Sequence, residues 1–234
     1  KNKKNAIMIE PMANIVISSY KKNFNDLPNE DSNASELTVN NLFISDRIYG
    51  FDRNESGKRF NYGVKSSLFN DYGEFNLTLG QGYKSGGGQD VTIRGFNNNN
   101  KSNIVGQMMY KAVQYFSMIY SFQLDESNYR NDINQLTTAI TFDRISFAVN
   151  YLLIRKTLQN SGEKNQVSLS SKVKLTSKWT TSVSVQRDNV LNRNISRTIS
   201  ISREGCCTTF GFSVAETNQS SLSKPQKSYN LSLV

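Results

Sequence analysis

Apolar and polar residues alternate along most of this chain, in segments of about ten residues that are separated by clusters of turn-forming residues. A period of two places successive side chains on opposite faces of a β-strand. Segment 59–68 shows the pattern clearly, and its two faces are Phe60, Tyr62, Val64 and Leu68 against Arg59, Asn61, Lys65 and Ser67. No segment has a convincing helical period. The pattern therefore predicts an all-β chain of about twelve antiparallel strands joined by hairpins.

The first predicted strand contains a proline, and a polar stretch follows it. The apolar face of this strand consists of Ile7, Ile9, Ala13, Ile15 and Ile17. Pro11 interrupts the strand, and because proline has no amide hydrogen to donate, it suits an edge or a locally weakened pairing. Residues 21–41 are polar and carry several acidic residues, which predicts a loop.

Alternation by itself does not separate a transmembrane β-barrel from a soluble β-sandwich. Three features favour the barrel: strands of about ten residues, polar faces rich in Ser, Thr, Asn and Gln, and aromatic residues near strand ends. These aromatic residues are Tyr62, Tyr83, Tyr110, Tyr151 and Trp179. Some short strands and a low mean hydropathy favour the sandwich. We therefore predict an antiparallel transmembrane barrel and keep the sandwich as an alternative.

Composition argues against most catalytic and metal sites. The chain has no histidine, which removes the commonest general base and the usual neutral metal ligand. Catalysis by carboxylates alone remains possible, but no pair of carboxylates has a supporting context, and we expect neither a bound cofactor nor a bound metal. The triplet Gly86–Gly88 is followed neither by Lys-Ser/Thr nor by a helix, and it does not predict a phosphate-binding loop.

The formal net charge is +9, which suits nucleic acid, anionic lipid or a phosphate-bearing glycolipid. No stretch approaches the roughly 18 consecutive apolar residues of a transmembrane helix. The chain opens with Lys1-Asn2-Lys3-Lys4 and runs directly into a strand pattern, without a signal peptide. We expect from this that the chain begins inside a longer protein.

Residues 42–53, LFISDRIYGFDR, depart from the simple alternation of their neighbours. They combine aromatic residues, two Asp-Arg pairs and Gly50 in a dozen positions. This content predicts an ordered hairpin loop whose Asp46-Arg47 and Asp52-Arg53 pairs lie on the surface. Surface ion pairs of this kind contribute at most about 1 kcal/mol each.

The same stretch resembles a motif of the LptD family, outer-membrane proteins that assemble lipopolysaccharide. The matching residues are Asn41, Leu42, Phe43, Arg47, Gly50, Asp52 and Arg53. Further similarities, in the same order along the chain, are Ile9-Glu10-Pro11, Leu27-Pro28 with Asp31, Tyr62-Gly63, Leu79-Gly80-Gln81 and Cys206-Cys207. The resemblance implies that residues 1–234 are a partial barrel, the C-terminal half of a larger one, in the outer membrane of a diderm bacterium. It also implies an N-terminal periplasmic domain outside this chain.

The resemblance further implies that the protein is not an enzyme but a device for translocation and insertion. Lipopolysaccharide passes through the barrel lumen and is inserted into the outer leaflet through a lateral seam, to which residues 229–234 belong. The implied partners are lipopolysaccharide, a plug lipoprotein, the periplasmic lipopolysaccharide-transport bridge and the outer membrane, with no nucleic acid. Lys65, Lys172 and Lys174 are then candidates for lumen-facing residues. The chain ends in Val234 rather than in the aromatic residue that commonly ends an outer-membrane strand.

Cys206 and Cys207 are adjacent, and in a strand they point to opposite faces, so a disulfide between them is badly strained. Free thiols suit a cytosolic protein, whereas an oxidising periplasm favours disulfides to other cysteines, of which this chain has none. No histidine or further cysteine completes a metal site. The resemblance implies disulfides from both residues to the missing N-terminal domain.

One strand conflicts with a purely lipid-facing apolar surface. Between residues 194 and 203, Arg197 and Arg203 share a face with Ile195, Ile199 and Ile201. The predicted opposite face consists of Asn194, Ser196, Thr198, Ser200 and Ser202. At the membrane midplane an arginine costs roughly 2–4 kcal/mol, so Arg197 lies near an interface or the strand is not flatly lipid-facing. The alternatives to lipopolysaccharide assembly are a passive outer-membrane pore or structural barrel, and a soluble sandwich that binds carbohydrate.

Overall fold

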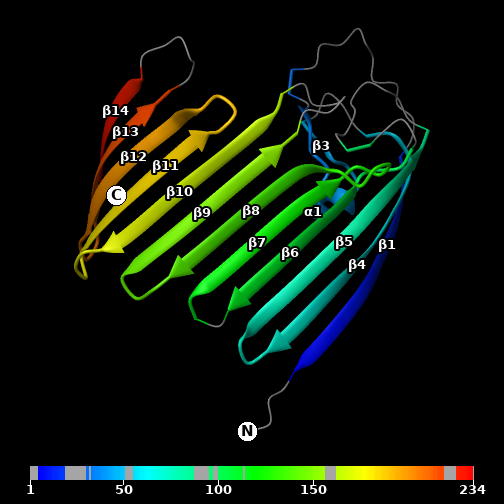
Figure 1. Cartoon of the computed structure of the whole chain (residues 1–234), viewed down its shortest axis with the longest axis horizontal. Helices are drawn as coiled ribbons and strands as arrows, with labels where there is room; N and C mark the ends of the chain where they lie inside the picture. Colours follow the sequence, from blue (N-terminus) through cyan, green and yellow to red (C-terminus); the bar gives the residue numbers. More distant parts are fainter. Residues whose placement is uncertain are drawn as a thin grey trace. The chain divides into compact units, whose positions relative to one another are not determined.

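The computed structural model describes residues 5–18, 30–31, 33–50, 55–86, 95–96, 100–112, 114–155, 162–218 and 225–233. Twelve of its strands form one antiparallel sheet in the order β1-β4-β5-β6-β7-β8-β9-β10-β11-β12-β13-β14 (Figure 1). Their bounds are β1 Ala6–Ser18, β4 Gly57–Asn70, β5 Gly73–Ser85, β6 Ile104–Ala112, β7 Phe116–Leu124, β8 Asn131–Thr141, β9 Ile145–Ile154, β10 Lys164–Lys174, β11 Trp179–Asp188, β12 Arg193–Glu204, β13 Thr209–Thr217 and β14 Gln226–Leu233. The predicted all-β class and the twelve antiparallel strands are confirmed.

Three short elements in the polar stretch after β1 were not predicted. β2 (Asn33–Ala34) pairs with β3 (Ile48–Tyr49) in a separate two-stranded sheet, and α1 (Val39–Leu42) lies between them in the sequence. The prediction of a plain loop up to residue 41, without any helix, is therefore wrong for these residues. In the described part of the chain, no helix has the length and apolar character needed to cross a membrane.

The chain divides into two compact units. Unit 1 comprises Lys1–Tyr110, Tyr120–Asn134 and Arg155–Gly162, and unit 2 comprises Lys111–Ile119, Gln135–Ile154 and Glu163–Val234. β1, β4 and β5 belong to unit 1, and β9 to β14 belong to unit 2 apart from residues Arg155–Gly162 between β9 and β10.

Short turns link four pairs of neighbouring strands at one end. Residues 71–72, 142–144, 175–178 and 205–208 link β4 to β5, β8 to β9, β10 to β11 and β12 to β13. We call this end of the strands the turn end. The opposite, loop end carries the longest connections, between β1 and β4 and between β5 and β6.

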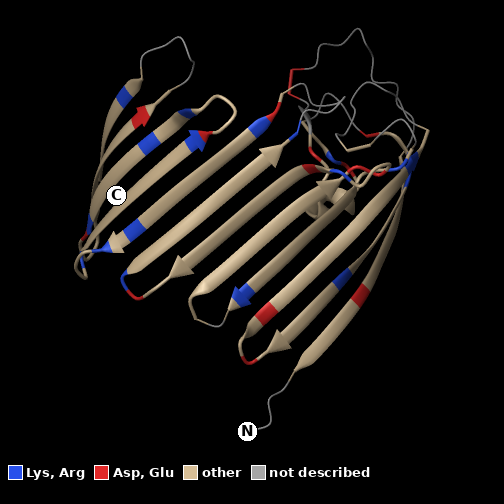
Figure 2. Cartoon of the chain, in the orientation of Figure 1, with Lys and Arg blue, Asp and Glu red and all other residues tan. Residues whose placement is uncertain are grey.

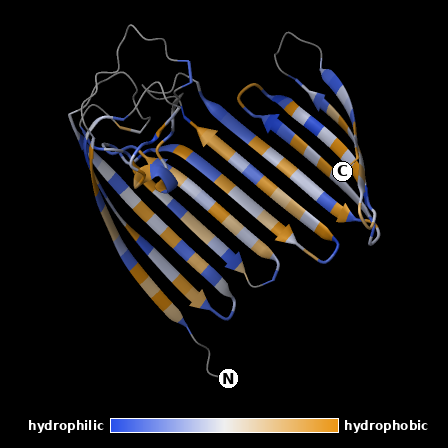
Figure 3. Cartoon of the chain, turned by 180° about the vertical axis from the view of Figure 1, so that it is seen from behind, coloured by the Kyte–Doolittle hydropathy of each residue, from blue (hydrophilic) through white to orange (hydrophobic). Residues whose placement is uncertain are grey.

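The burial pattern of unit 1 is the reverse of a soluble sandwich. Ile15, Phe60 and Tyr83 are register partners on β1, β4 and β5, and 70%, 43% and 43% of their surfaces are exposed. Asn61, on the opposite face of β4, is completely buried. Hydropathy alternates along the strands (Figure 3), and a charged pair interrupts long uncharged stretches midway along β1 and β4 (Figure 2). The exposed face is thus apolar, as a lipid-facing surface requires.

The buried apolar core is small and lies on the polar side of the strands. Its members are Leu37, Leu42, Ile48, Phe96 and Val105, with Val39 and Phe43 packed against them. Most of these residues come from the segment between β1 and β4 rather than from the strands. The core is therefore formed where this segment covers the sheet.

Candidate functional site: the polar face and the segment that covers it

Residues 35–50, which we call the cover segment, pack on the polar face of β4 and β5. Leu42 occupies the space next to Gly80, where a Cβ atom would overlap its Cδ2 atom. Phe43 contacts the same surface, since a Cβ atom at Gly63 would lie 3.1 Å from its ring. The two glycines thus leave room for these side chains. The contacts bring together three of the short motifs named above, Asn41-Leu42-Phe43, Tyr62-Gly63 and Leu79-Gly80.

Two asparagines join the cover segment to β1 and β4. The Asn14 side-chain amide on β1 donates a hydrogen bond of 2.8 Å to the backbone oxygen of Phe43. The Asn61 amide on β4 donates to the Asn14 Oδ1 atom at 2.7 Å. Because Asn61 is completely buried, this network ties β1 and the cover segment together at a site closed to water.

Asn41 organises the cover segment internally. Its Oδ1 atom accepts a 2.8 Å hydrogen bond from the backbone amide of Thr38, at the start of α1. Its Nδ2 atom donates at 2.8 Å to the backbone oxygen of Glu36. Asn41 therefore satisfies backbone groups that the one-turn helix leaves open, and it holds Leu42 and Phe43 toward the sheet.

Arg47 is buried, and its partner is Glu55. The Arg47 Nε atom donates to Glu55 Oε2 at 2.8 Å, Arg59 Nη1 lies 3.0 Å from the same oxygen, and the Lys84 Nζ atom lies 3.9 Å from Oε1. The side chains of Arg47, Arg59 and Glu55 are at most 1% exposed. The prediction of a surface Asp46-Arg47 pair is therefore wrong. Asp46 instead accepts a 3.0 Å hydrogen bond from the amide of Ile48.

The charges around Glu55 decide its ionisation. Burial acts to raise the pKa of this carboxyl, but the hydrogen bond from Arg47 and the charges of Arg47, Arg59 and Lys84 outweigh it and hold the pKa below its usual range. The ionised carboxylate is thus the common anchor for cations from the cover segment, β4 and β5. The Arg47 guanidinium also lies 4.8 Å from the centre of the Phe96 ring.

The structure describes only some of the remaining motif residues. Gly50 has φ +108°, and a Cβ atom there would lie 2.7 Å from the Oδ1 atom of Asp31, so both conformation and space require glycine. Asp52 and Arg53 lie outside the described residues, and so do Leu27 and Pro28. The motif residues Asn41, Leu42, Phe43, Arg47 and Gly50 thus lie in one folded segment.

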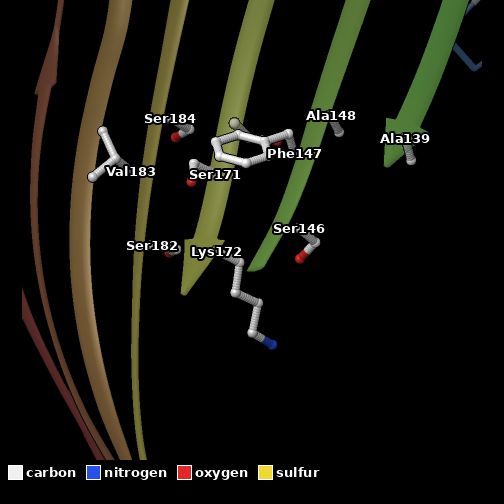
Figure 4. Close-up of a pocket in the computed structure, with 10 residues that line it drawn as sticks. Ala139, Ser146, Phe147, Ala148, Ser171, Lys172, Ser182, Val183 and Ser184 are labelled. Carbon is white, nitrogen blue, oxygen red and sulfur yellow. The ribbon is translucent and has the colours of Figure 1, made fainter. Parts of the chain in front are cut away.

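In unit 2 the polar face carries rows of hydroxyl groups. One row runs across six strands in register, through Ser146, Lys172, Ser182, Ser200, Ser213 and Asn230. The hydroxyls of Ser182 and Ser200 are 2.6 Å apart. A shallow hollow of about 370 Å³ lies along this row, lined by Ser146, Ser182, Ser184 and Lys172 among others (Figure 4). Such a surface offers donors and acceptors that match the hydroxyls of a sugar chain.

The three candidate lysines have different surroundings. Lys65 lies opposite Glu10 in register, and its Nζ atom is 3.5 Å from a Glu10 carboxylate oxygen. Lys172 lies between Ser146 and Ser182, and Lys174 lies opposite Thr180. In the described residues, neither Lys172 nor Lys174 forms an ion pair within 4 Å.

The cysteine pair is exposed and free, and it lies in the turn between β12 and β13. The alternation expected for a strand does not apply here. Gly205 closes this turn with a backbone hydrogen bond of 2.7 Å to the oxygen of Thr208. Both thiols are at the turn end of the strands, where β14 also ends.

Sequence reasoning missed Glu55 and Lys84 as partners of the motif. Glu55 lies two positions before β4, and Lys84 lies on the polar face of β5, but no local sequence pattern connects either residue with Arg47.

The comparisons with known proteins bear on the whole arrangement. The model of one family, described as LptD, LPS transport system D, matches residues 3–179. No curated protein matches the chain.

Proposed function

Since the chain belongs to the LptD family, whose members act in lipopolysaccharide transport at the outer membrane of Gram-negative bacteria, we propose that its polar face lines the passage for the lipopolysaccharide sugar chain. The chain is then the C-terminal part of a larger barrel. The family transports and assembles lipopolysaccharide, and it is not an enzyme family. Lipopolysaccharide is accordingly cargo, carried without chemical change.

The observation that carries the proposal is the two-sided character of unit 2. The row Ser146, Lys172, Ser182, Ser200, Ser213 and Asn230 is hydrophilic over six strands. The next row on the opposite face includes Val183, Ile199, Val214 and Tyr229, of which Ile199 is 59% exposed. One face suits hydrated sugar and the other suits lipid.

The last strand suits one side of a lateral exit for the lipid part. β14 stands at one end of the strand order, and every described residue of β14 is exposed. In the larger barrel, its partner across the seam would be the first strand of the missing N-terminal part. Weak pairing there would let the seam open.

The proposed partners are those that the family resemblance implies. The polar face of unit 2 would receive the plug lipoprotein. The turn end, where outer-membrane barrels have their short periplasmic turns, would face the N-terminal domain and the periplasmic transport bridge. Cys206 and Cys207 are exposed at that end, where they would form disulfides to cysteines of the N-terminal domain.

The test is photo-crosslinking from two adjacent positions in the full-length protein, in cells. A photoreactive residue replaces Ser200, on the polar face, or Ile199, on the apolar face. When delivery of new lipopolysaccharide is blocked, we expect capture at position 200 to disappear, while capture at position 199 by resident outer-leaflet lipid persists. A passive pore predicts no lipopolysaccharide at position 200 under either condition.

A further inference from the structure

A row of charged residues crosses the otherwise apolar face of unit 2 near the loop end. Arg197 on β12, Glu216 on β13 and Lys227 on β14 are register partners on consecutive strands. Arg187 on β11 lies two residues beyond Val185, the partner of Arg197, and therefore on the same face. Figure 2 shows charged residues gathered at this end of β11 to β14. We call Arg187, Arg197, Glu216 and Lys227 the outer charged row.

The neighbours of the outer charged row show that it lies on the lipid-facing side. The next row toward the turn end contains Val183, Ile199, Val214 and Tyr229. Beyond it lies the row of Ile201, Phe212 and Leu231. Ile199, Tyr229 and Leu231 are 59%, 67% and 72% exposed, so no part of the described chain covers this face.

The distance along β12 gives the depth of Arg197. Arg203 follows Arg197 by six positions, and its guanidinium lies 5.8 Å from the centre of the Trp179 ring at the turn end. At about 3.3 Å per residue these arginines are roughly 20 Å apart along the strand. A strand tilt of about 40° reduces this to some 15 Å along the membrane normal, less than the apolar band of about 25 Å. If Arg203 and Trp179 mark one interface, the backbone of Arg197 lies about 10 Å below the other, and a long arginine side chain can extend toward that interface.

The charges in this row do not balance. Three cations face one carboxylate, and Arg187, Arg197 and Lys227 are all exposed. Asn194 lies opposite Arg187, and with its amide oxygen turned toward Arg197 it accepts a 3.3 Å hydrogen bond from the Nε atom. This hydrogen bond engages one edge of the Arg197 guanidinium and leaves its other N–H donors available. The register shift between Gln186 and Arg187 brings Asn194 to this face, where simple alternation placed it on the other.

We propose that Arg187, Arg197 and Lys227 form a docking site on the outer wall of the barrel for the phosphate groups of a glycolipid in the outer leaflet. The inference rests on the proposed function, which makes the loop end extracellular and supplies this lipid. Guanidinium groups bind phosphate oxygens through charge-assisted hydrogen bonds, and these are stronger near an apolar layer than in water. The site lies beside β14, one side of the proposed seam, so it meets a lipid that has just left the barrel.

The experiment uses the full-length protein in lipid nanodiscs with a photoreactive residue at Tyr229, which lies in the apolar row next to the outer charged row. Capture of lipopolysaccharide is compared between the parent protein and the triple variant R187Q/R197Q/K227Q. Because a charge-assisted hydrogen bond contributes about 1.5–3 kcal/mol, we expect capture to fall on the order of tenfold or more. Lipopolysaccharide stripped of its phosphates should be captured equally weakly by both proteins.

Two further variants make the result specific. R203Q removes a cation from the same face at the opposite end of β12, and capture at position 229 should be unchanged. E216Q removes the only carboxylate of the row, and capture should rise. Equal capture by the parent and triple variants, or undiminished capture of dephosphorylated lipopolysaccharide, would overturn the docking site. Capture at position 200 in cells tests the passage separately, so failure of the docking site is distinguishable from failure of the proposed function.

Discussion

Leu42 fills the space that a side chain at Gly80 would need, although the two residues are 38 positions apart in the sequence. The contact joins the most distinctive motif of the chain to a plain strand position. It also shows that the cover segment lies against the polar face of the strands rather than standing away from them. Replacement of either residue therefore tests how the cover segment is held.

Replacing Gly80 with alanine should destabilise unit 1, because the new Cβ atom overlaps Leu42 and forces the cover segment to shift. Overpacking of this kind costs about 1–3 kcal/mol. The measurement is the urea midpoint of unfolding of the full-length protein in detergent. Gly162→Ala is the matched control, since nothing lies within 4 Å of a Cβ atom there. Equal midpoints for both variants would show that Leu42 does not occupy this space.

Leu42→Ala should cost about 2–5 kcal/mol, because the completely buried side chain leaves a cavity. In the double variant L42A/G80A, the alanine at position 80 partly fills that cavity. We therefore expect the combined loss to be smaller than the sum of the single losses by about 0.5–3 kcal/mol. Strict additivity in the same urea titrations would mean that the two residues are not in contact.

Glu55→Gln should be among the most damaging single changes in unit 1. It leaves Arg47 and Arg59 charged and buried without their carboxylate, which costs about 3–5 kcal/mol. Glu10→Gln is the control. More than two fifths of each side chain in the Glu10–Lys65 pair is exposed, and such a pair contributes about 0–1 kcal/mol. Thermal unfolding of both variants distinguishes them, and a similar small loss for each would contradict the buried cluster.

Acid should weaken the same cluster. The pKa of Glu55 is lower in the folded protein than in the unfolded chain, where a glutamate titrates near 4.3. Its stabilising contribution is therefore complete above that value and is lost as the pH falls through the lower, folded pKa. We expect the unfolding free energy to fall below about pH 4.3 in the parent protein and to fall less in Glu55→Gln. Parallel pH profiles would contradict this assignment.

Cys206 and Cys207 should form disulfides to cysteines outside this chain. In the full-length protein from native membranes, we expect a mobility difference between reducing and non-reducing gels. Cys206→Ser and Cys207→Ser should each retain a difference, and only the double variant should abolish it. Two alkylatable thiols and no difference in the parent would favour the passive pore.

Alternation predicted the strands well because it is a local property of the backbone. The residues on each side of β4 follow directly from a period of two. The prediction was less successful near residue 194. There the register with β11 shifts, so Asn194 changes face for a reason that lies in the neighbouring strand.

The motif of residues 42–53 was recognised, but its surroundings were not predictable. Two Asp-Arg neighbours favour local surface pairs, whereas Arg47 binds Glu55, which also lies close to Arg59 and Lys84, in a fold that closes over β4 and β5. The small core had the same origin, since Leu37 and Leu42 of the cover segment meet Phe96 from the connection between β5 and β6. Short polar stretches carry no periodic signal that would place them on a particular face of the sheet.

The sequence by itself determined the all-β class, the antiparallel hairpins, the two faces of the strands and the family resemblance, because each depends on local order along the chain. Only the tertiary structure decided that the cover segment packs on the polar face, that Glu55 binds the buried Arg47 and Arg59 beside the partly exposed Lys84, and that Arg197, Glu216 and Lys227 lie side by side. These arrangements depend on register and on contacts between residues far apart in the chain, and such contacts exist only once the strands have paired.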